Sequence, residues 1–264
     1  MIWLLAYALG GVTAGFLAGL LGVGGGMTIV PIISAVLTAQ KIAPDHVIHL
    51  ALATAMCSIV FTSSATALQH HRRGAVDWAM FKRMAPGMVT GTLLATLFSG
   101  YVPQRLLAVA FSVIVIAAGI QILVGKKPAP GKTAPGTPVV FAYTMGVGII
   151  AGLVSAGGAF LTMPFMVYCG VPLITAIGTG VVLAIPIAIM GSIGYIVSGW
   201  NAPGLPPYTL GFIYLPALAA IVCASIAVVP LGVRLAHRLP VQTLRRSFAV
   251  LLFVLAAKML YSYW

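Results

Sequence analysis

The chain has 264 residues, of which 61% are hydrophobic and only 6% are charged, and its formal net charge is +12. A soluble domain of this size would carry roughly a quarter charged residues, whereas residues 133–233 contain no Lys, Arg, Asp, Glu or His. This composition excludes a soluble globular domain and predicts an all-α polytopic membrane protein. No basic face exists to grip phosphates, so nucleic acid is not an expected partner.

Apolar runs predict four membrane segments in each half of the chain. In the first half the runs cover 2–39 (broken at 22–26), 47–69, 78–100 and 104–124. In the second half they cover 139–169 (broken at 155–159), 173–199, 208–235 and 241–262. A stretch rich in Pro, Gly and Lys separates the halves and predicts a flexible cytoplasmic linker. The expected organisation is therefore repeat 1 (1–125), the linker (126–138) and repeat 2 (139–264).

The two halves share a glycine motif. Residues 15–31 and 148–164 align without a gap, and 7 of the 17 aligned positions are identical. Further along, Thr54 and Thr179 occupy matching positions in the second segment of each half. A hydrophobic segment interrupted by glycine at matching places in two halves is typical of a transporter's binding site.

Positive charge sets the expected topology. The strongest basic clusters lie within 70–83, 126–132 and 234–246, and the positive-inside bias places all of them in the cytoplasm. Eight single crossings would put the last two clusters on opposite sides of the membrane. The two broken segments are also too long for one span, since each would reach roughly 47–57 Å across a hydrocarbon core of about 30 Å.

A re-entrant segment or hairpin at each glycine break removes both difficulties. Each half then makes an odd number of net crossings, which predicts two inverted-topology repeats with both termini on the outer face. Whether each limb half-enters or fully crosses the membrane is left open by the sequence.

The glycine breaks are the candidate binding site. Glycine lets the backbone turn sharply, and a helix that starts after the turn directs unpaired N–H groups and the positive end of its dipole into the protein. Such an end binds a small anion without Lys or Arg. The alternative is that the glycines only let helices pack closely. The expected substrate-binding residues are Gly24, Gly25, Gly26, Met27, Thr28, Thr54, Gly157, Gly158, Ala159, Thr162 and Thr179.

Other polar residues have competing interpretations. Thr54 and Thr179 either donate to an anion or bond back to a carbonyl of the preceding turn, as mid-helix Thr often does. His49 and Lys258 lie near segment ends, where basic side chains usually extend to the membrane interface; a role in substrate binding is the less favoured alternative. The three cysteines fit no metal-site spacing, so no cofactor, metal or structural disulfide is expected. No catalytic residue is evident, and the chain is not expected to be an enzyme.

The glycine pattern resembles a known family. Gly19-x-x-Gly22-x-Gly24-Gly25-Gly26 with Pro31, its second-half echo, and the element Gly74-Ala-Val-Asp77-Trp78 are similar to the sulfite exporter TauE/SafE family of bacterial transporters. The likeness covers essentially the whole chain. It implies transport of a small sulfur-containing anion (sulfite, thiosulfate, sulfoacetate or a related organosulfonate) across the cytoplasmic (inner) membrane. The second motif reads Ser155-Ala-Gly-Gly-Ala159, so the two half-sites are expected to be unequal.

The expected function is that of a secondary transporter working by alternating access. Its expected partners are a small sulfur oxyanion and membrane lipid. H⁺ is a candidate coupling ion, carried by the substrate's own protonation state, because no acid falls mid-membrane. The oligomeric state is left open, with a homodimer as one option. The alternatives are an uncoupled anion channel and, less favoured, a membrane enzyme or assembly factor.

Overall fold

A computed structural model of the chain describes residues 2–21, 25–124, 135–236 and 241–263, and nearly all of them are helical. Within this part of the chain, five helices are long and apolar enough to cross a membrane. The elements, in chain order, are α1 (Ile2–Leu21), α2 (Gly26–Ala39), α3 (Val47–Arg72), α4 (Trp78–Leu97), the 3₁₀ helix η1 (Ser99–Tyr101), α5 (Gln104–Val124), α6 (Thr137–Val154), α7 (Ala159–Tyr168), α8 (Leu173–Gly199), β1 (Thr209–Leu210), β2 (Ile213–Tyr214), α9 (Leu215–Ala236) and α10 (Val241–Tyr263). The all-α class is therefore confirmed.

Local sequence signals explain where several helices begin. α4 begins after Asp77, whose carboxylate accepts a hydrogen bond from the Met80 amide at 2.9 Å and so caps the helix. α8 begins directly after Pro172, and α6 carries Pro138 in its first turn. Proline suits these places because the first turn of a helix does not use its N–H groups.

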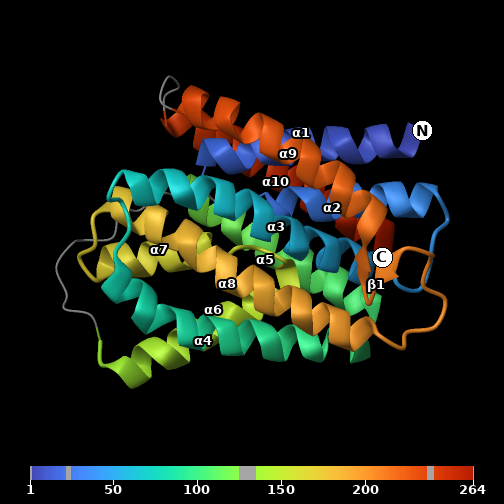
Figure 1. Cartoon of the computed structure of the whole chain (residues 1–264), viewed down its shortest axis with the longest axis horizontal. Coiled ribbons are helices and arrows are strands. Elements are labelled where there is room, and N and C mark those ends of the chain that lie inside the picture. Colours follow the sequence, from blue (N-terminus) through green and yellow to red (C-terminus); the bar gives the residue numbers. More distant parts are fainter. Residues whose placement is uncertain (1, 22–24, 125–134, 237–240, 264) are drawn as a thin grey trace.

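The helices lie side by side along one long axis (Figure 1). α1 packs against α9 at one edge of the bundle, α4 packs against α6 at the other, and α3 pairs with α8 between them. α3 is the most enclosed of the candidate spans, since 78% of its most apolar window is buried. α1 begins and α10 ends at the same end of the long axis, which we call the terminal end (Figure 1).

The packing pairs correspond between the two halves of the chain. Exchanging α1–α5 with α6–α10 turns the α1–α9 pair into α6–α4, and the α2–α3 pair into α7–α8. The α3–α8 and α5–α10 pairs each turn into themselves. Each of these packing pairs therefore has a counterpart when the two halves of the chain are exchanged.

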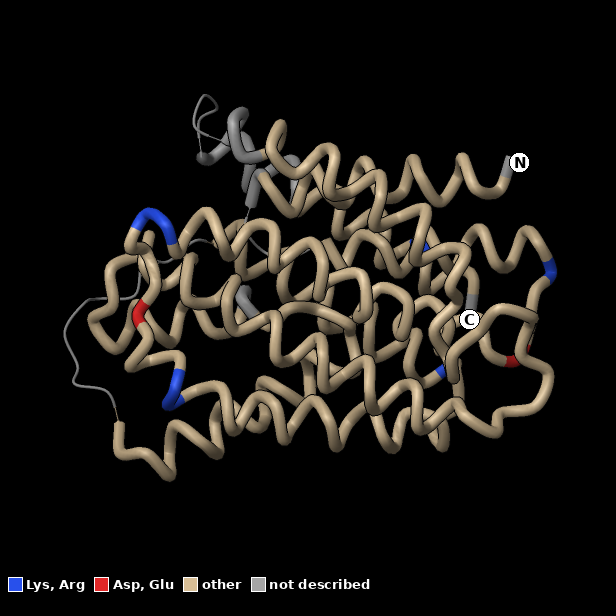
Figure 2. Tube along the Cα trace, viewed as in Figure 1, with Lys and Arg blue, Asp and Glu red and all other residues tan. Residues whose placement is uncertain are grey.

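Charged residues gather at the two ends of the bundle (Figure 2). Arg72 ends α3 and Lys82 lies in the first turns of α4, at the end opposite the terminal end. The described chain between the two ends is almost free of charge, which suits a hydrocarbon environment.

The segment expected at 208–235 differs from the structure at its start. Residues 209–214 form a two-stranded antiparallel hairpin, with Thr209 opposite Tyr214 and Leu210 opposite Ile213. The physical reason is local: Tyr208 and Gly211 have positive φ angles of 63° and 55°, which an α-helix does not accommodate. α9 therefore begins only at Leu215.

Candidate functional site

Both glycine motifs lie between two helices. α1 ends at Leu21 and α2 begins at Gly26, with Gly25 as its N-cap; the expected site residue Gly24 lies outside the described residues. In the second half, α6 ends at Val154 and α7 begins at Ala159. Ser155 and Gly158 both adopt left-handed backbone, with φ angles of 49° and 69°. Glycine takes this conformation readily, which explains its place at the start of α7.

The two breaks touch each other. A methyl group placed on Gly26 would collide with the carbonyl oxygen of Ser155 and would lie 2.7 Å from Cδ1 of Ile59 on α3. A methyl group on Gly157 would lie 2.8 Å from Cβ of Ala184 on α8. The backbones of α2 and the α6–α7 connection can approach this closely only because Gly26 has no side chain. The breaks are thus enclosed by the central pair of helices.

Each short helix starts at a glycine carbonyl. The amides of Thr28 and Ile29 both donate to the Gly25 carbonyl at 3.1 Å, and the Thr162 amide donates to the Gly158 carbonyl at 3.0 Å. N–H groups that come before these bonds have no acceptor within their own helix. A glycine N-cap has no side chain to receive them. The first amides of α2 and α7 are therefore left without an acceptor in their own helices, close to the contact between the two breaks.

The two threonines expected to bind a ligand at the breaks instead form hydrogen bonds at the starts of their own helices. The Thr28 hydroxyl donates to the Gly25 carbonyl at 2.8 Å, and the Thr162 hydroxyl donates to the Gly158 carbonyl at 3.2 Å. Both side chains are buried, as is Met27. In this arrangement the hydroxyl protons stabilise the helix starts, and the backbone amides are the donors left for a ligand.

Two further hydroxyls secure the second break. Ser155 donates to the Leu52 carbonyl on α3 at 2.7 Å, and Tyr195 on α8 donates to the Gly152 carbonyl on α6 at 2.9 Å. Both side chains are fully buried. Sequence reasoning did not single out Tyr195. The only signal was a phenol in an otherwise uncharged apolar helix, and its partner lies 43 residues away in sequence.

Thr54 and Thr179 make equivalent contacts at opposite ends of the bundle. The Thr54 hydroxyl oxygen accepts from the amide of Tyr214 at 3.0 Å, and that of Thr179 accepts from the amide of Asp77 at 2.9 Å. Tyr214 directly precedes α9, and Asp77 directly precedes α4. Thr179 also donates to the Thr175 carbonyl at 2.7 Å, which is the back-bond considered from the sequence.

These two threonines are not brought together at the breaks. Thr54 is the eighth residue of α3, which starts at the terminal end, and Thr179 is the seventh residue of α8, which starts at the other end (Figure 1). Each one anchors the start of a neighbouring helix instead.

His49 forms a buried junction at the terminal end. Its Nε2 lies 3.0 Å from the Ser99 carbonyl oxygen and 3.1 Å from the Val102 carbonyl oxygen, so this nitrogen must carry the proton and donate. The ring stacks on Phe212 at a centroid distance of 4.9 Å and meets the His46 ring at 5.7 Å. His49 is 3% exposed. The expectation that it extends to the interface was therefore wrong, because the backbone carbonyls of the α4–α5 connection offer acceptors inside the fold.

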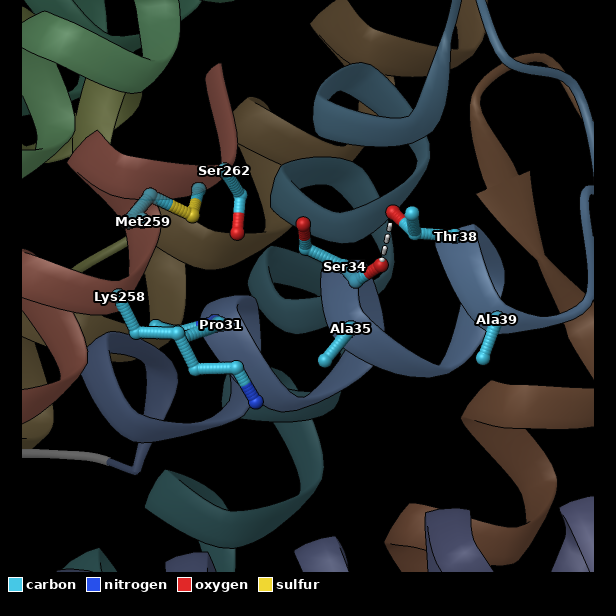
Figure 3. A pocket seen from close by; sticks show the side chains of 8 residues that line it. All are labelled: Pro31, Ser34, Ala35, Thr38, Ala39, Lys258, Met259 and Ser262. Atoms are coloured by element: carbon cyan, nitrogen blue, oxygen red, sulfur yellow. Dashed lines mark hydrogen bonds between the residues drawn. The ribbon is translucent and has the colours of Figure 1, made fainter. Parts of the chain in front are cut away.

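A cavity of ≈ 290 Å³ lies between α2 and α10 at the terminal end (Figure 3). Its lining residues are Pro31, Ser34, Ala35, Thr38, Ala39, Lys258, Met259 and Ser262. The cavity is separate from the glycine breaks but shares α2 with the first of them, since Pro31 follows Gly26 by five residues. Among the described residues, no three His, Cys, Asp or Glu side chains gather in a way that could hold a metal ion.

Comparison with known proteins places the chain among membrane transporters. The family model described as "Sulfite exporter TauE/SafE" matches residues 7–259. A probable membrane transporter protein of Haemophilus influenzae is 33% identical over 253 residues, covering 94% of this chain and 95% of the relative. The probable membrane transporter proteins YunE and YdhB of Bacillus subtilis are each 25% identical; YunE covers 72% of this chain and 77% of its own length, and YdhB covers 70% and 76%.

Proposed function

Because the chain belongs to the sulfite exporter TauE/SafE family, we propose that it is a secondary transporter that moves a small sulfur-containing oxyanion across the bacterial cytoplasmic membrane by alternating access. The family, the names of the relatives and the five apolar helices support a multi-pass membrane transporter and not an enzyme. The observation that carries the finer proposal is the contact between the two glycine breaks, at Gly26 and Ser155.

The proposed anion cradle consists of backbone amides at residues 25–27 and 157–160, because the amides of Thr28 and Thr162 already donate to glycine carbonyls. The starts of α2 and α7 each present donors and the positive end of a helix dipole, and no charged side chain lies in either motif. One helix N-terminus stabilises a negative charge by about 0.3–1 kcal/mol when exposed and up to about 2 kcal/mol when partly buried. Two such ends without a fixed cation are expected to bind an anion weakly, so that the anion can dissociate during transport.

Two inverted repeats support alternating access in this proposal. The exchangeable packing pairs, the matching contacts of Thr54 and Thr179 at opposite ends, and the common end of both termini are each expected of an inverted repeat. We assign the terminal end to the outer face, because the basic residues near the α3–α4 connection lie at the other end.

Proton coupling is proposed to act through the substrate. The chain has two acidic residues, Asp45 and Asp77, and Asp77 serves as a helix cap. Neither lies within a membrane helix, so neither is placed for a mid-membrane proton relay. An uncoupled channel remains the competing function; saturable flux with counterflow supports the transporter, and single-channel current supports the channel.

Sulfite flux into proteoliposomes tests the cradle. Gly26→Ala and Gly158→Leu are expected to lower flux at least about tenfold. A methyl group on Gly26 collides with the Ser155 carbonyl oxygen, whereas a side chain at Gly158 is strained at a φ of 69° and would lie 2.6 Å from Cε of Met88. Gly146→Ala is the matched control, since a methyl group there meets nothing within 4 Å, and its flux should equal that of the wild type.

Folding is checked separately by size-exclusion profile and thermal unfolding in detergent. Should Gly26→Ala not fold, the second measurement is the rise in melting temperature that sulfite causes in the wild type, compared with Gly158→Leu. Wild-type flux in either folded cradle variant would reject the cradle.

A further inference from the structure

We infer that the cavity between α2 and α10 is an outer anion-binding antechamber, in which Lys258 holds a small oxyanion such as a sulfonate or sulfite on its way to or from the glycine breaks. This inference rests on the proposed function for the direction of travel, but the binding itself can be tested without transport.

The position of the cavity suits an antechamber. α2 runs from the first glycine break to the terminal end, and the cavity follows this helix from Pro31 to Ala39. Thr38 and Ala39 are exposed at its outer side, whereas Pro31 is buried and lies about 7–8 Å of helical rise from Gly26. An anion at this place is therefore on the surface that leads along α2 towards the cradle.

Lys258 supplies the charge. Its side chain extends across to α2, towards Pro31 and Ala35, and does not follow its own helix to the chain end (Figure 3). The described residues give the amine no hydrogen-bond or ion-pair partner. The surrounding wall is more apolar than polar, and Lys258 itself is exposed, so its ammonium group is accessible to a ligand from outside the protein.

Among the described residues, no acidic side chain lines the cavity to supply a counter-charge for Lys258. The whole chain has only two acidic residues, Asp45 and Asp77, and neither lines the cavity. Ser262 adds an exposed hydroxyl from α10, whereas the Thr38 hydroxyl is already used, donating to the Ser34 carbonyl at 2.8 Å. The donors offered to an anion are thus one ammonium and one hydroxyl on the same helix.

The volume fits a small ligand. At ≈ 290 Å³ the cavity falls at the lower limit of ordinary small-molecule sites, about 300–1,000 Å³, and can hold a hydrated oxyanion. A lipid phosphate has the same oxyanion chemistry, so the experiment has to separate a dissolved anion from a lipid headgroup.

Thiol modification in vesicles measures the local charge directly. Ser262→Cys is placed in a chain whose three native cysteines are replaced by Ala, and its rates of reaction with an anionic sulfonatoethyl and a cationic trimethylammonioethyl methanethiosulfonate are compared. Lys258→Gln should lower the anionic-to-cationic rate ratio about tenfold, as removal of a unit charge in water predicts at about 6 Å, the spacing of residues four apart on a helix. Lys41→Gln, which removes another cation in the connection after α2, should change the ratio less than about twofold. An unchanged ratio in Lys258→Gln overturns the inference.

The occupant is identified with two vesicle compositions. Methanesulfonate should slow the reaction of the anionic reagent with the introduced thiol in pure phosphatidylcholine vesicles and in vesicles containing phosphatidylglycerol. Protection by phosphatidylglycerol alone, without any effect of methanesulfonate, would show a lipid site and overturn the antechamber.

Flux measurements separate this inference from the proposed function. In Lys258→Gln the KM for sulfite should rise several-fold at low ionic strength with kcat within about twofold, and the difference should shrink in high salt. If the wild type carries no sulfite, the proposed function fails while the rate ratio still decides the antechamber. If the wild type carries sulfite and the rate ratio is unchanged, only the antechamber fails.

Discussion

Single polar side chains in this protein serve mainly to satisfy backbone groups of other segments. His49 donates to the carbonyls of Ser99 and Val102, and Tyr195 donates to that of Gly152. A buried carbonyl without a partner is costly where water cannot reach it. Such side chains therefore hold segments together that the apolar contacts alone would not orient.

Replacing His49 should loosen the junction at the terminal end. In His49→Ala the carbonyls of Ser99 and Val102 lose their donor and Phe212 loses its stacking partner, so we expect a loss of about 2–4 kcal/mol of stability. The measurement is the melting temperature in detergent, which should fall by several degrees. His49→Gln keeps a donor and should lose less. Equal melting temperatures for His49→Ala and the wild type would contradict the junction.

At the scale of elements, two hydroxyls fix how neighbouring helices start. Thr54 on α3 accepts the amide before α9, and Thr179 on α8 accepts the amide before α4. The two contacts lie at opposite ends of the bundle, so a structural change that opens one end can break one contact while the other persists.

Thr54→Val and Thr179→Val test these contacts, and each variant is the control of the other. Valine has nearly the shape of threonine but accepts no hydrogen bond, so the Tyr214 amide should exchange its hydrogen faster in Thr54→Val, and the Asp77 amide faster in Thr179→Val. Loss of a buried bond of about 1–3 kcal/mol predicts roughly 5- to 150-fold faster exchange where local opening governs it. The exchange rates are measured by hydrogen-exchange mass spectrometry of the peptides that contain Tyr214 and Asp77. Unchanged exchange at both amides would show that the contacts do not control the helix starts.

At the scale of the whole molecule, the positions of the basic residues and of the chain ends favour one orientation of the protein in the membrane. α1 begins and α10 ends at one end of the bundle, while the basic residues of the α3–α4 connection lie at the other end (Figures 1 and 2). On this basis, and by the positive-inside bias, we propose that both termini lie outside the cytoplasm.

Reporter fusions test this orientation. Alkaline phosphatase fused after the last residue should be active and a green fluorescent protein at the same place dark, because the first folds only outside the cytoplasm and the second only within it. A fluorescent protein inserted in the 126–132 linker serves as the internal control and should be bright. Fluorescence from the C-terminal fusion would reject the proposed orientation.

Much of the architecture could be predicted because apolar runs and helix-breaking residues determine the structure of the residues next to them in the chain. The helices at 104–124 and 173–199 have the bounds expected from their apolar runs. Residues 208–214 were misassigned because their hydropathy resembles that of the helix that follows. Their hairpin depends on the backbone angles of Tyr208 and Gly211, which hydropathy does not report.

The candidate site could be predicted only in part. The doubled glycines indicated where chain breaks were needed, but not that Gly26 would lie against the Ser155 carbonyl. Thr54 and Thr179 each accept a hydrogen bond from a backbone amide, yet their partners, Tyr214 and Asp77, lie 160 and 102 residues away in sequence. No local pattern encodes contacts over such separations.

The sequence by itself determined the membrane environment, the helical class and the family, because these follow from composition and from motifs whose residues are close together along the chain. The tertiary structure decided which backbones meet, which hydroxyls hold which helix starts, and that Lys258 faces a cavity on α2. These features depend on packing between distant segments, where one absent side chain or one buried carbonyl determines the contact.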